Sequence, residues 1–182
     1  MALRLRAARP ADLPAVVALH VQSWRDAYRG VLDPAFLDGP IEQRLAAHWH
    51  DAMIARRRPG AVALATAGGT IAGFVAAWRD DHKCHIDNLH VRPGMRSAGI
   101  GRAMLGFAAV RLREQGCVSA YLWVFARNPG AIRLYATLGA VIGPEVPRET
   151  QGQKVLEREV RWPHIAALIA ACAAPPLRGS PP

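Results

Sequence analysis

Residues 86–104 read IDNLHVRPGMRSAGIGRAM, a pattern that predicts the end of a strand, a short loop and the start of a helix. Backbone N–H groups in the first turn of a helix lack intrahelical partners, and the helix dipole is positive there, so such a turn favours phosphate groups. Gly99 and Gly101 carry no side chain that would keep a pyrophosphate from the main chain. Arg96 and Arg102 can donate charge-assisted hydrogen bonds to the same anion.

The pattern R-x-x-G-x-G in this stretch is weak by itself, because a plain strand-to-helix turn can also use glycine. The stretch has neither the G-K-[ST] of a P-loop nor the G-x-G-x-x-G of a dinucleotide-binding turn. Its place between a predicted strand and the longest regular helical pattern of the chain favours an anion site.

Hydrophobic patterning around this stretch predicts an α/β fold with a mixed sheet and helices on its faces. The expected order is β-α-α-β-β-β-α-β-α-β-β. The predicted strands are 3–6, 61–67, 70–79, 83–91 and 119–125, with a short final pair, 140–142 and 154–160, around a polar loop. The predicted helices are 10–28, 34–55 with a break at Gly39–Pro40, 99–115, 128–138 and 163–174. Residues 1–162 are expected to form one domain, and residues 163–182 an extra helix and a Pro-rich tail.

The composition of the 182 residues is that of one compact domain, since 51% are hydrophobic. The three cysteines, Cys84, Cys117 and Cys172, form no C-x-x-C pair, which argues against a disulfide framework or a structural zinc site and favours a reducing cytoplasm. No secretory signal pattern is visible at the N-terminus. The longest C-terminal apolar stretch, residues 165–174, is about half of the ~20 residues that span a bilayer, so we expect no membrane partner.

The net charge of +9 favours anionic ligands. All but two of the 23 basic residues are arginines, and they are scattered; the only run is 56–58, where they would suit the C-terminal end of a helix. The scattered arginines therefore make nucleic-acid binding the least favoured of the functions considered for this chain.

Two motifs resemble the GNAT N-acetyltransferase superfamily. LHVRPGMRSAGIGRAML, residues 89–105, resembles its acetyl-CoA-binding motif, and LWVFARNPGAIRLYATLGA, residues 122–140, resembles its second motif. SWRDAYRGVL, residues 23–32, is similar to the acceptor-side helices of many members. The resemblance spans roughly residues 3–161 and implies the GNAT acyl-CoA N-acyltransferase fold.

The resemblance also implies roles for individual residues. Main-chain groups of Leu89, His90 and Val91 would pair with the pantetheine arm and the acetyl carbonyl, as an added strand would. Asn128 would contact the pantetheine region, although it is equally suited to cap a helix before Pro129. Tyr135 would donate a proton to the CoA thiolate, although its ring could simply pack under the sheet. The amides that would hold the pyrophosphate are those of Arg96, Ser97, Ala98, Gly99, Ile100, Gly101 and Arg102.

The base that deprotonates the attacking amine is open. Strand alternation predicts His85 and Asp87 on one face of their strand, and Asn88 and His90 on the other. His85 stands where some members carry a glutamate base, so our hypothesis is that His85 or Asp87 assists deprotonation; the alternative is that both are surface residues. Four aromatic residues are candidates either for an acceptor pocket or for the core: Trp24, Tyr28, Trp49 and Trp78.

The expected function is direct transfer of an acetyl group from acetyl-CoA to a primary amine in a ternary complex, with no metal. The acceptor, a small molecule or a peptide, is not identified by the sequence. The alternative is a non-catalytic acyl-CoA-binding regulatory module on the same fold. Homodimers are common among similar proteins, and nothing in the sequence decides this point.

Overall fold

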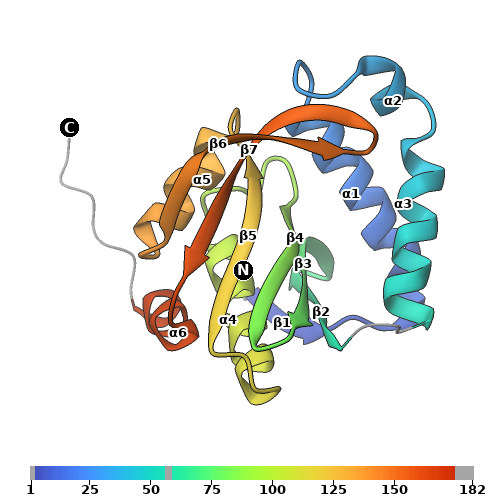
Figure 1. Ribbon diagram of the computed structural model, residues 1–182. Coiled ribbons are helices and arrows are strands. Elements are labelled where there is room, and N and C mark those ends of the chain that lie inside the picture. Colours follow the sequence, from blue (N-terminus) through green and yellow to red (C-terminus); the bar gives the residue numbers. More distant parts are fainter. Residues whose placement is uncertain (1–2, 56–58, 175–182) are drawn as a thin grey trace, which may run out of the picture.

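The computed structural model describes residues 3–55 and 59–174 and confirms the mixed α/β fold (Figure 1). The Arg56–Arg58 run and the tail from residue 175 onward lie outside the described residues. The elements are β1 (Leu3–Ala7), η1 (Pro10–Asp12), α1 (Leu13–Ala27), α2 (Pro34–Asp38), α3 (Ile41–His50), η2 (Asp51–Ala55), β2 (Gly60–Ala67), β3 (Thr70–Asp80), β4 (Lys83–Val91), α4 (Ile100–Glu114), β5 (Ser119–Phe125), α5 (Pro129–Thr137), β6 (Val141–Thr150), β7 (Gln153–Trp162) and α6 (Ile165–Ala173). The predicted break at Gly39–Pro40 separates α2 from α3.

The seven strands form one sheet in the order β1-β2-β3-β4-β5-β7-β6, and only the pairing of β4 with β5 is parallel. Each face of the sheet buries its own apolar cluster. Met104 and Leu105 of α4 pack with β3 residues such as Val75 on one face. Leu19 of α1 and Trp49 of α3 pack on the other face. Of the helices within the described residues, none is long and apolar enough to cross a bilayer.

Strand β4 pairs with β5 only at its beginning, where residues 83–85 face residues 119–121. Beyond His85 the two strands separate, although β4 continues to Val91 and β5 to Phe125. The edge of β4 that faces β5 is therefore open over residues 86–91. An open edge presents backbone donors and acceptors to whatever lies in the gap.

The last two strands form a longer hairpin than the sequence predicts, and the expected polar loop after residue 142 is wrong. Gln151 and Gly152 join β6 to β7 with φ values of 56° and 75°, as a two-residue turn of the I′ type requires. Pro144 and Pro147 hide the strand character of β6, but prolines are compatible with an edge strand. The hairpin crosses toward α2 (Figure 1), where the Gln153 side chain accepts a hydrogen bond of 2.7 Å from the backbone N–H of Asp33.

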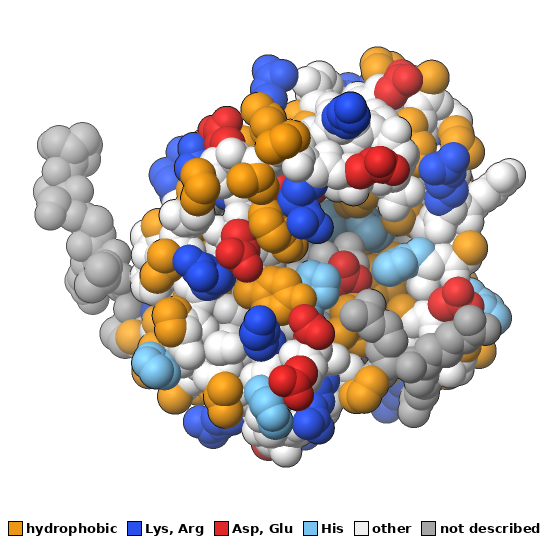
Figure 2. Space-filling view, viewed as in Figure 1, with side chains coloured by type: hydrophobic (Ala, Val, Ile, Leu, Met, Phe, Trp, Pro, Cys, Tyr) orange, Lys and Arg blue, Asp and Glu red, His pale blue; other side chains and the backbone are white. Residues whose placement is uncertain are grey.

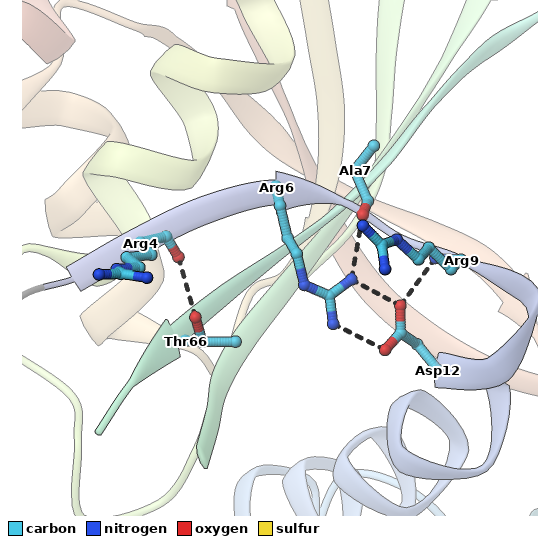
Figure 3. Close-up of polar contacts among 6 residues, drawn as sticks. All are labelled: Arg4, Arg6, Ala7, Arg9, Asp12 and Thr66. Carbon is cyan, nitrogen blue, oxygen red and sulfur yellow. Dashed lines mark hydrogen bonds and ion pairs between the residues drawn. The ribbon is translucent and has the colours of Figure 1, made fainter. Parts of the chain in front are cut away.

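The N-terminal strand is tied to the first helical segment by a bidentate ion pair (Figure 3). Both terminal nitrogens of Arg6 lie 2.7 Å from the Asp12 carboxylate, which also accepts a hydrogen bond from the backbone N–H of Arg9. The hydrogen bonds from Arg6, opposed by partial burial, lower the pKa of Asp12 to about 2. The pair fixes the entry of the chain into α1, the helix that forms one wall of the site described next.

Candidate active site

Two adjoining cavities lie where β4 and β5 separate. The first, about 410 Å³, is bounded by the loop before α4, the end of β4, α1 and α5, and we call it the loop cavity. The second, about 290 Å³, lies between α1, α3, β4, β5 and the β6–β7 hairpin, and we call it the hairpin cavity. Figure 2 shows histidine side chains and an acidic side chain gathered around a hollow on this face of the molecule. The residues common to both cavities are Tyr28, Leu89, His90, Asn128, Ala131 and Tyr135.

The loop cavity contains nearly all residues of the predicted anion site. Arg96, Ser97 and residues 99–102 line it, whereas Ala98 does not. Gly99 has φ +75° and stands immediately before α4, and Ser97 also has positive φ, at 66°. The backbone N–H groups of the first turn of α4, starting at Ile100, have no intrahelical acceptor. The helix therefore presents its positive end to the cavity.

The two arginines predicted to bind an anion have different surroundings. Arg96 pairs with Asp26 of α1 at 2.7 Å, and both side chains are close to half exposed, so Arg96 can exchange this partner for an anion. The Arg102 guanidinium donates hydrogen bonds to the carbonyls of Ala171, Cys172 and Ala174 at the end of α6. It is engaged in capping that helix, which leaves only the backbone of Arg102 for the cavity.

Asn128 and Tyr135 line both cavities, and each also has the structural role that the sequence offered as its alternative. The Asn128 side chain caps α5 by accepting a hydrogen bond of 3.2 Å from Ala131 N, and it also lines both cavities. Burial raises the pKa of Tyr28 to about 12 despite its hydrogen bond with Asn128. The Tyr135 ring packs edge-on against Trp162 at 5.9 Å, and burial raises the pKa of its phenol above the ordinary value of 10. Both phenols therefore keep their protons.

The predicted division of His85, Asp87 and His90 between two faces of β4 is wrong. The register with β3 shifts between Ala76 and Ala77, so that β4 carries one extra residue at this point, a β-bulge. Cys84 and Ile86 before the bulge, and Leu89 and Val91 after it, therefore all pack in the core beneath α4. His85, Asp87 and His90 all face the hairpin cavity. Periodicity cannot reveal a bulge, because the extra residue has no sequence signature of its own.

Each of the predicted base candidates has defined contacts in the hairpin cavity. The His85 ring stacks on Tyr121, with centroids 4.8 Å apart. The Asp87 carboxylate accepts a hydrogen bond of 2.9 Å from Trp78 Nε1, and its Oδ2 lies 3.9 Å from His48 Nε2. A tryptophan N–H can only donate, so this contact holds the carboxylate in place without neutralising it.

The four candidate aromatic residues form two layers. Trp24 and Tyr28 line the hairpin cavity, but Trp24 is also a buried member of the apolar cluster on this face and Tyr28 packs against that cluster, so both alternatives stay open for them. Trp49 and Trp78 are buried behind the cavity, as the core alternative requires, and each donates its indole N–H to a cavity residue: Trp78 to Asp87, and Trp49 to His20 Nδ1 at 2.9 Å.

His20 was not predicted as a site residue. Its Nδ1 accepts from Trp49, so the ring is neutral and its proton is on Nε2. The His20 ring lies 4.4 Å from that of His90. Burial, with His90 and His48 nearby, lowers the pKa of His20 well below its ordinary value, and burial together with the Arg96 charge lowers the pKa of His90 to about 3. Helical spacing is the signal that could have found His20, because it lies one turn before Trp24 on α1.

The hairpin contributes a second acidic group that the sequence did not reveal. Glu157 of β7 is buried, and its carboxylate accepts hydrogen bonds from Arg148 Nε at 2.9 Å and from Thr150 Oγ1 at 2.7 Å. Arg148 also stacks over the Trp123 ring at 3.8 Å. Because Glu157 is paired with Arg148, Asp87 is the carboxylate of this cavity without a basic partner of fixed charge. The described residues contain no group of three or more His, Cys, Asp and Glu side chains arranged to hold a metal ion.

Comparisons with known proteins agree on one family. The model of the acetyltransferase (GNAT) family matches residues 18–140. The chain is 29% identical over 136 residues to Rv2775 of Mycobacterium tuberculosis, which is named as an N-acetyltransferase, and the match covers 73% of this chain and 76% of the relative. It is 38% identical over 77 residues to streptothricin acetyltransferase of Streptomyces lavendulae, covering 40% of each.

Solved structures show the same fold. PaiA N-acetyltransferase from Thermoplasma acidophilum, solved with coenzyme A, superposes with a TM-score of 0.70 at 18% identity, covering 89% of this chain and all of that one. YncA from Salmonella typhimurium, solved with acetyl-CoA, has a TM-score of 0.66 at 19% identity, covering 89% and 94%. The family match extends over more than half of the chain, from α1 to the end of α5, and includes both cavities' shared residues. The protein therefore belongs to the GNAT family of acetyltransferases.

Proposed function

We propose that this acetyltransferase moves an acetyl group from acetyl-CoA directly to a primary amine, with both bound at once. The observation that supports this most is that the two cavities meet along a single set of residues, among them His90 and Tyr135. One ligand in each cavity would bring its reacting group to this junction, and holding two reactants in contact supplies much of the rate enhancement of a bimolecular reaction.

The loop cavity fits acetyl-CoA in three independent respects. The open edge of β4 at Leu89, His90 and Val91 offers main-chain groups to the amides of a pantetheine arm. The amides of residues 96–102 and the Arg96 side chain suit a pyrophosphate at the start of α4. Asn128 lines the same cavity and is shared with the hairpin cavity. The PaiA and YncA structures, which contain coenzyme A and acetyl-CoA, support the assignment.

The hairpin cavity fits an amine acceptor. With His20 and His90 neutral and Glu157 paired, the Asp87 carboxylate favours a positively charged ammonium group. An ammonium group has no lone pair for attack, so a proton must leave first. We propose that Asp87 or His85 receives it, since both side chains line this cavity. At about 290 Å³, the cavity suits a small amine or the end of a peptide.

Tyr135 is proposed as the acid that protonates the departing thiolate. Acetyl-CoA supplies the thioester, and the phenol lies at the junction where that sulfur would leave. Burial raises the pKa of the phenol, and the same apolar surroundings raise that of a thiol, so the proton can pass between them.

We also propose a cytoplasmic location. The thiols of Cys84, Cys117 and Cys172 are free, which is in line with a reducing compartment.

The test is release of CoA thiol from acetyl-CoA in the presence of a panel of amines. We expect turnover with at least one amine, and a Tyr135→Phe variant that binds acetyl-CoA normally but has kcat lowered by about 10²-fold or more. Tyr121→Phe is the matched control, because it removes a hydroxyl that bonds to Asp80 and keeps the ring that stacks on His85, so it should leave kcat within about twofold. Tight acetyl-CoA binding without thiol release for any amine would instead favour the non-catalytic binding module.

A further inference from the structure

Among the described residues, only two buried side-chain polar atoms have no hydrogen-bond partner: His20 Nε2 and Ser23 Oγ. Both residues are 1% exposed, and they lie one turn apart on the same face of α1. Nearly all buried polar groups in proteins are paired, and a helical serine commonly bonds to a carbonyl of the preceding turn. Ser23 does neither, which calls for a ligand as its missing partner.

Ser23 faces the loop cavity, whereas His20 faces the hairpin cavity. Its position along that cavity follows from its neighbours on α1. Three residues before it, His20 packs on His90 at the junction of the cavities. Three residues after it, Asp26 pairs with Arg96 of the loop before α4. Ser23 thus lies midway between the proposed reaction centre and the proposed pyrophosphate site.

We propose that the Ser23 hydroxyl is a binding contact for the pantetheine arm of the acyl-CoA, opposite the open edge of β4. This inference rests on the proposed function, because it takes the ligand of the loop cavity to be an acyl-CoA. The arm carries amide groups, and a serine hydroxyl both donates and accepts hydrogen bonds. The β4 edge at Leu89 and Val91 would hold one side of the arm, and Ser23 would hold the side that faces α1.

The Ser23→Ala substitution distinguishes a serine that stabilises the fold from one that binds a ligand, because the first role predicts a lower melting temperature and the second predicts weaker CoA binding. The Ser23 hydroxyl is buried without a partner, so the free protein gains nothing from it. Ser23→Ala should therefore leave the melting temperature of the free protein unchanged or raise it. The same variant should bind CoA and acetyl-CoA about fivefold to tenfold more weakly, the effect of losing one hydrogen bond.

The experiment measures the binding of three probes by calorimetry, together with the melting temperature of the free protein. CoA and acetyl-CoA contain the arm, and adenosine 3′,5′-bisphosphate lacks it, so only the first two should bind more weakly to Ser23→Ala. Thr137→Ala is the matched control. The exposed Thr137 side chain donates a hydrogen bond of 2.7 Å to the Leu134 carbonyl within α5. Its loss should lower the melting temperature slightly and leave the affinities for all three probes unchanged.

The inference would be overturned by unchanged CoA affinity in Ser23→Ala, by equal weakening of all three probes, or by a lowered melting temperature. A weakening confined to acetyl-CoA would also contradict it, because the contact would then be with the acetyl group. If the folded wild-type protein binds neither CoA nor acetyl-CoA, the proposed function fails as well. If the wild-type protein binds both and Ser23→Ala binds them equally well, only the role of Ser23 fails.

Discussion

Gly99 and Gly101 are both expected at the pyrophosphate site, yet the structure predicts opposite effects on stability when each becomes alanine. Gly99 has φ +75°, a conformation that costs a residue with a side chain about 1–2 kcal/mol. Gly101 lies in the first turn of α4, and a Cβ there would stand 3.4 Å from Leu134 Cδ2 and 3.7 Å from Val91 Cγ2, close to ordinary contact. Alanine is favoured over glycine in helices by up to about 1 kcal/mol.

We therefore expect Gly99→Ala to lower the melting temperature by about 2–8 °C, taking about 2–4 °C per kcal/mol for a chain of this size. Gly101→Ala should leave the melting temperature unchanged or raise it by up to about 4 °C. Both atoms that its methyl would approach belong to residues lining the loop cavity, so the methyl narrows the space beside the first amides of α4. Losing one charge-assisted hydrogen bond there, about 1.5–3 kcal/mol, weakens binding by about 10- to 100-fold.

Calorimetry with acetyl-CoA and differential scanning calorimetry of the free protein provide the two readouts. Gly116→Ala is the control for Gly99→Ala, because Gly116 has φ +91° at the far end of α4 and does not line the loop cavity. Gly116→Ala should lower the melting temperature about as much as Gly99→Ala does and should bind acetyl-CoA with wild-type affinity. Wild-type affinity in Gly101→Ala would refute the placement of the pyrophosphate at the start of α4. A lowered melting temperature in that variant would show that packing, rather than the ligand, requires this glycine.

Three further predictions concern other parts of the molecule. Asp87→Asn or His85→Ala should lower kcat by about 10²-fold and change its pH profile if that residue is the base; unchanged turnover and pH profile in both would exclude the two. The pKa of Asp12 is about 2 in the folded protein and near 3.9 when unfolded, so its contribution is complete above about pH 4 and lost as the pH falls toward 2. Because the Arg6 side chain is 38% exposed, Asp12→Asn should cost only about 1 kcal/mol in denaturant unfolding at pH 7, a difference that shrinks as the pH falls through 2 and vanishes below it. Arg102→Ala removes the hydrogen bonds to the last carbonyls of α6, so it should lower the free energy of unfolding by about 1–2 kcal/mol and the melting temperature by a few degrees. An unchanged melting temperature would mean that this cap does not stabilise the protein.

Most of the fold could be predicted because its signals are local. The α4 helix begins after a glycine that adopts positive φ, α5 begins with an Asn–Pro cap, and the break between α2 and α3 falls at Gly39–Pro40. Each signal acts within one turn of the chain, where side-chain and backbone sterics dominate. The loop after β4 and the position of Tyr135 on α5 follow from the same local order.

The arrangement of side chains around the cavities depended on contacts between distant segments. The bulge in β4 brings His85, Asp87 and His90 to one face, and only the pairing with β3 reveals it. Arg102 caps α6, 70 residues away, although its sequence context indicated an anion. The length of β6 was hidden by its two prolines, which only its place at the sheet edge allows. The sequence by itself therefore determined which elements form and where the glycine turn that we propose for the pyrophosphate lies, since those depend on neighbouring residues. Only the tertiary structure decided which polar side chains meet at the site, because strand register and burial arise from packing between segments far apart in the chain.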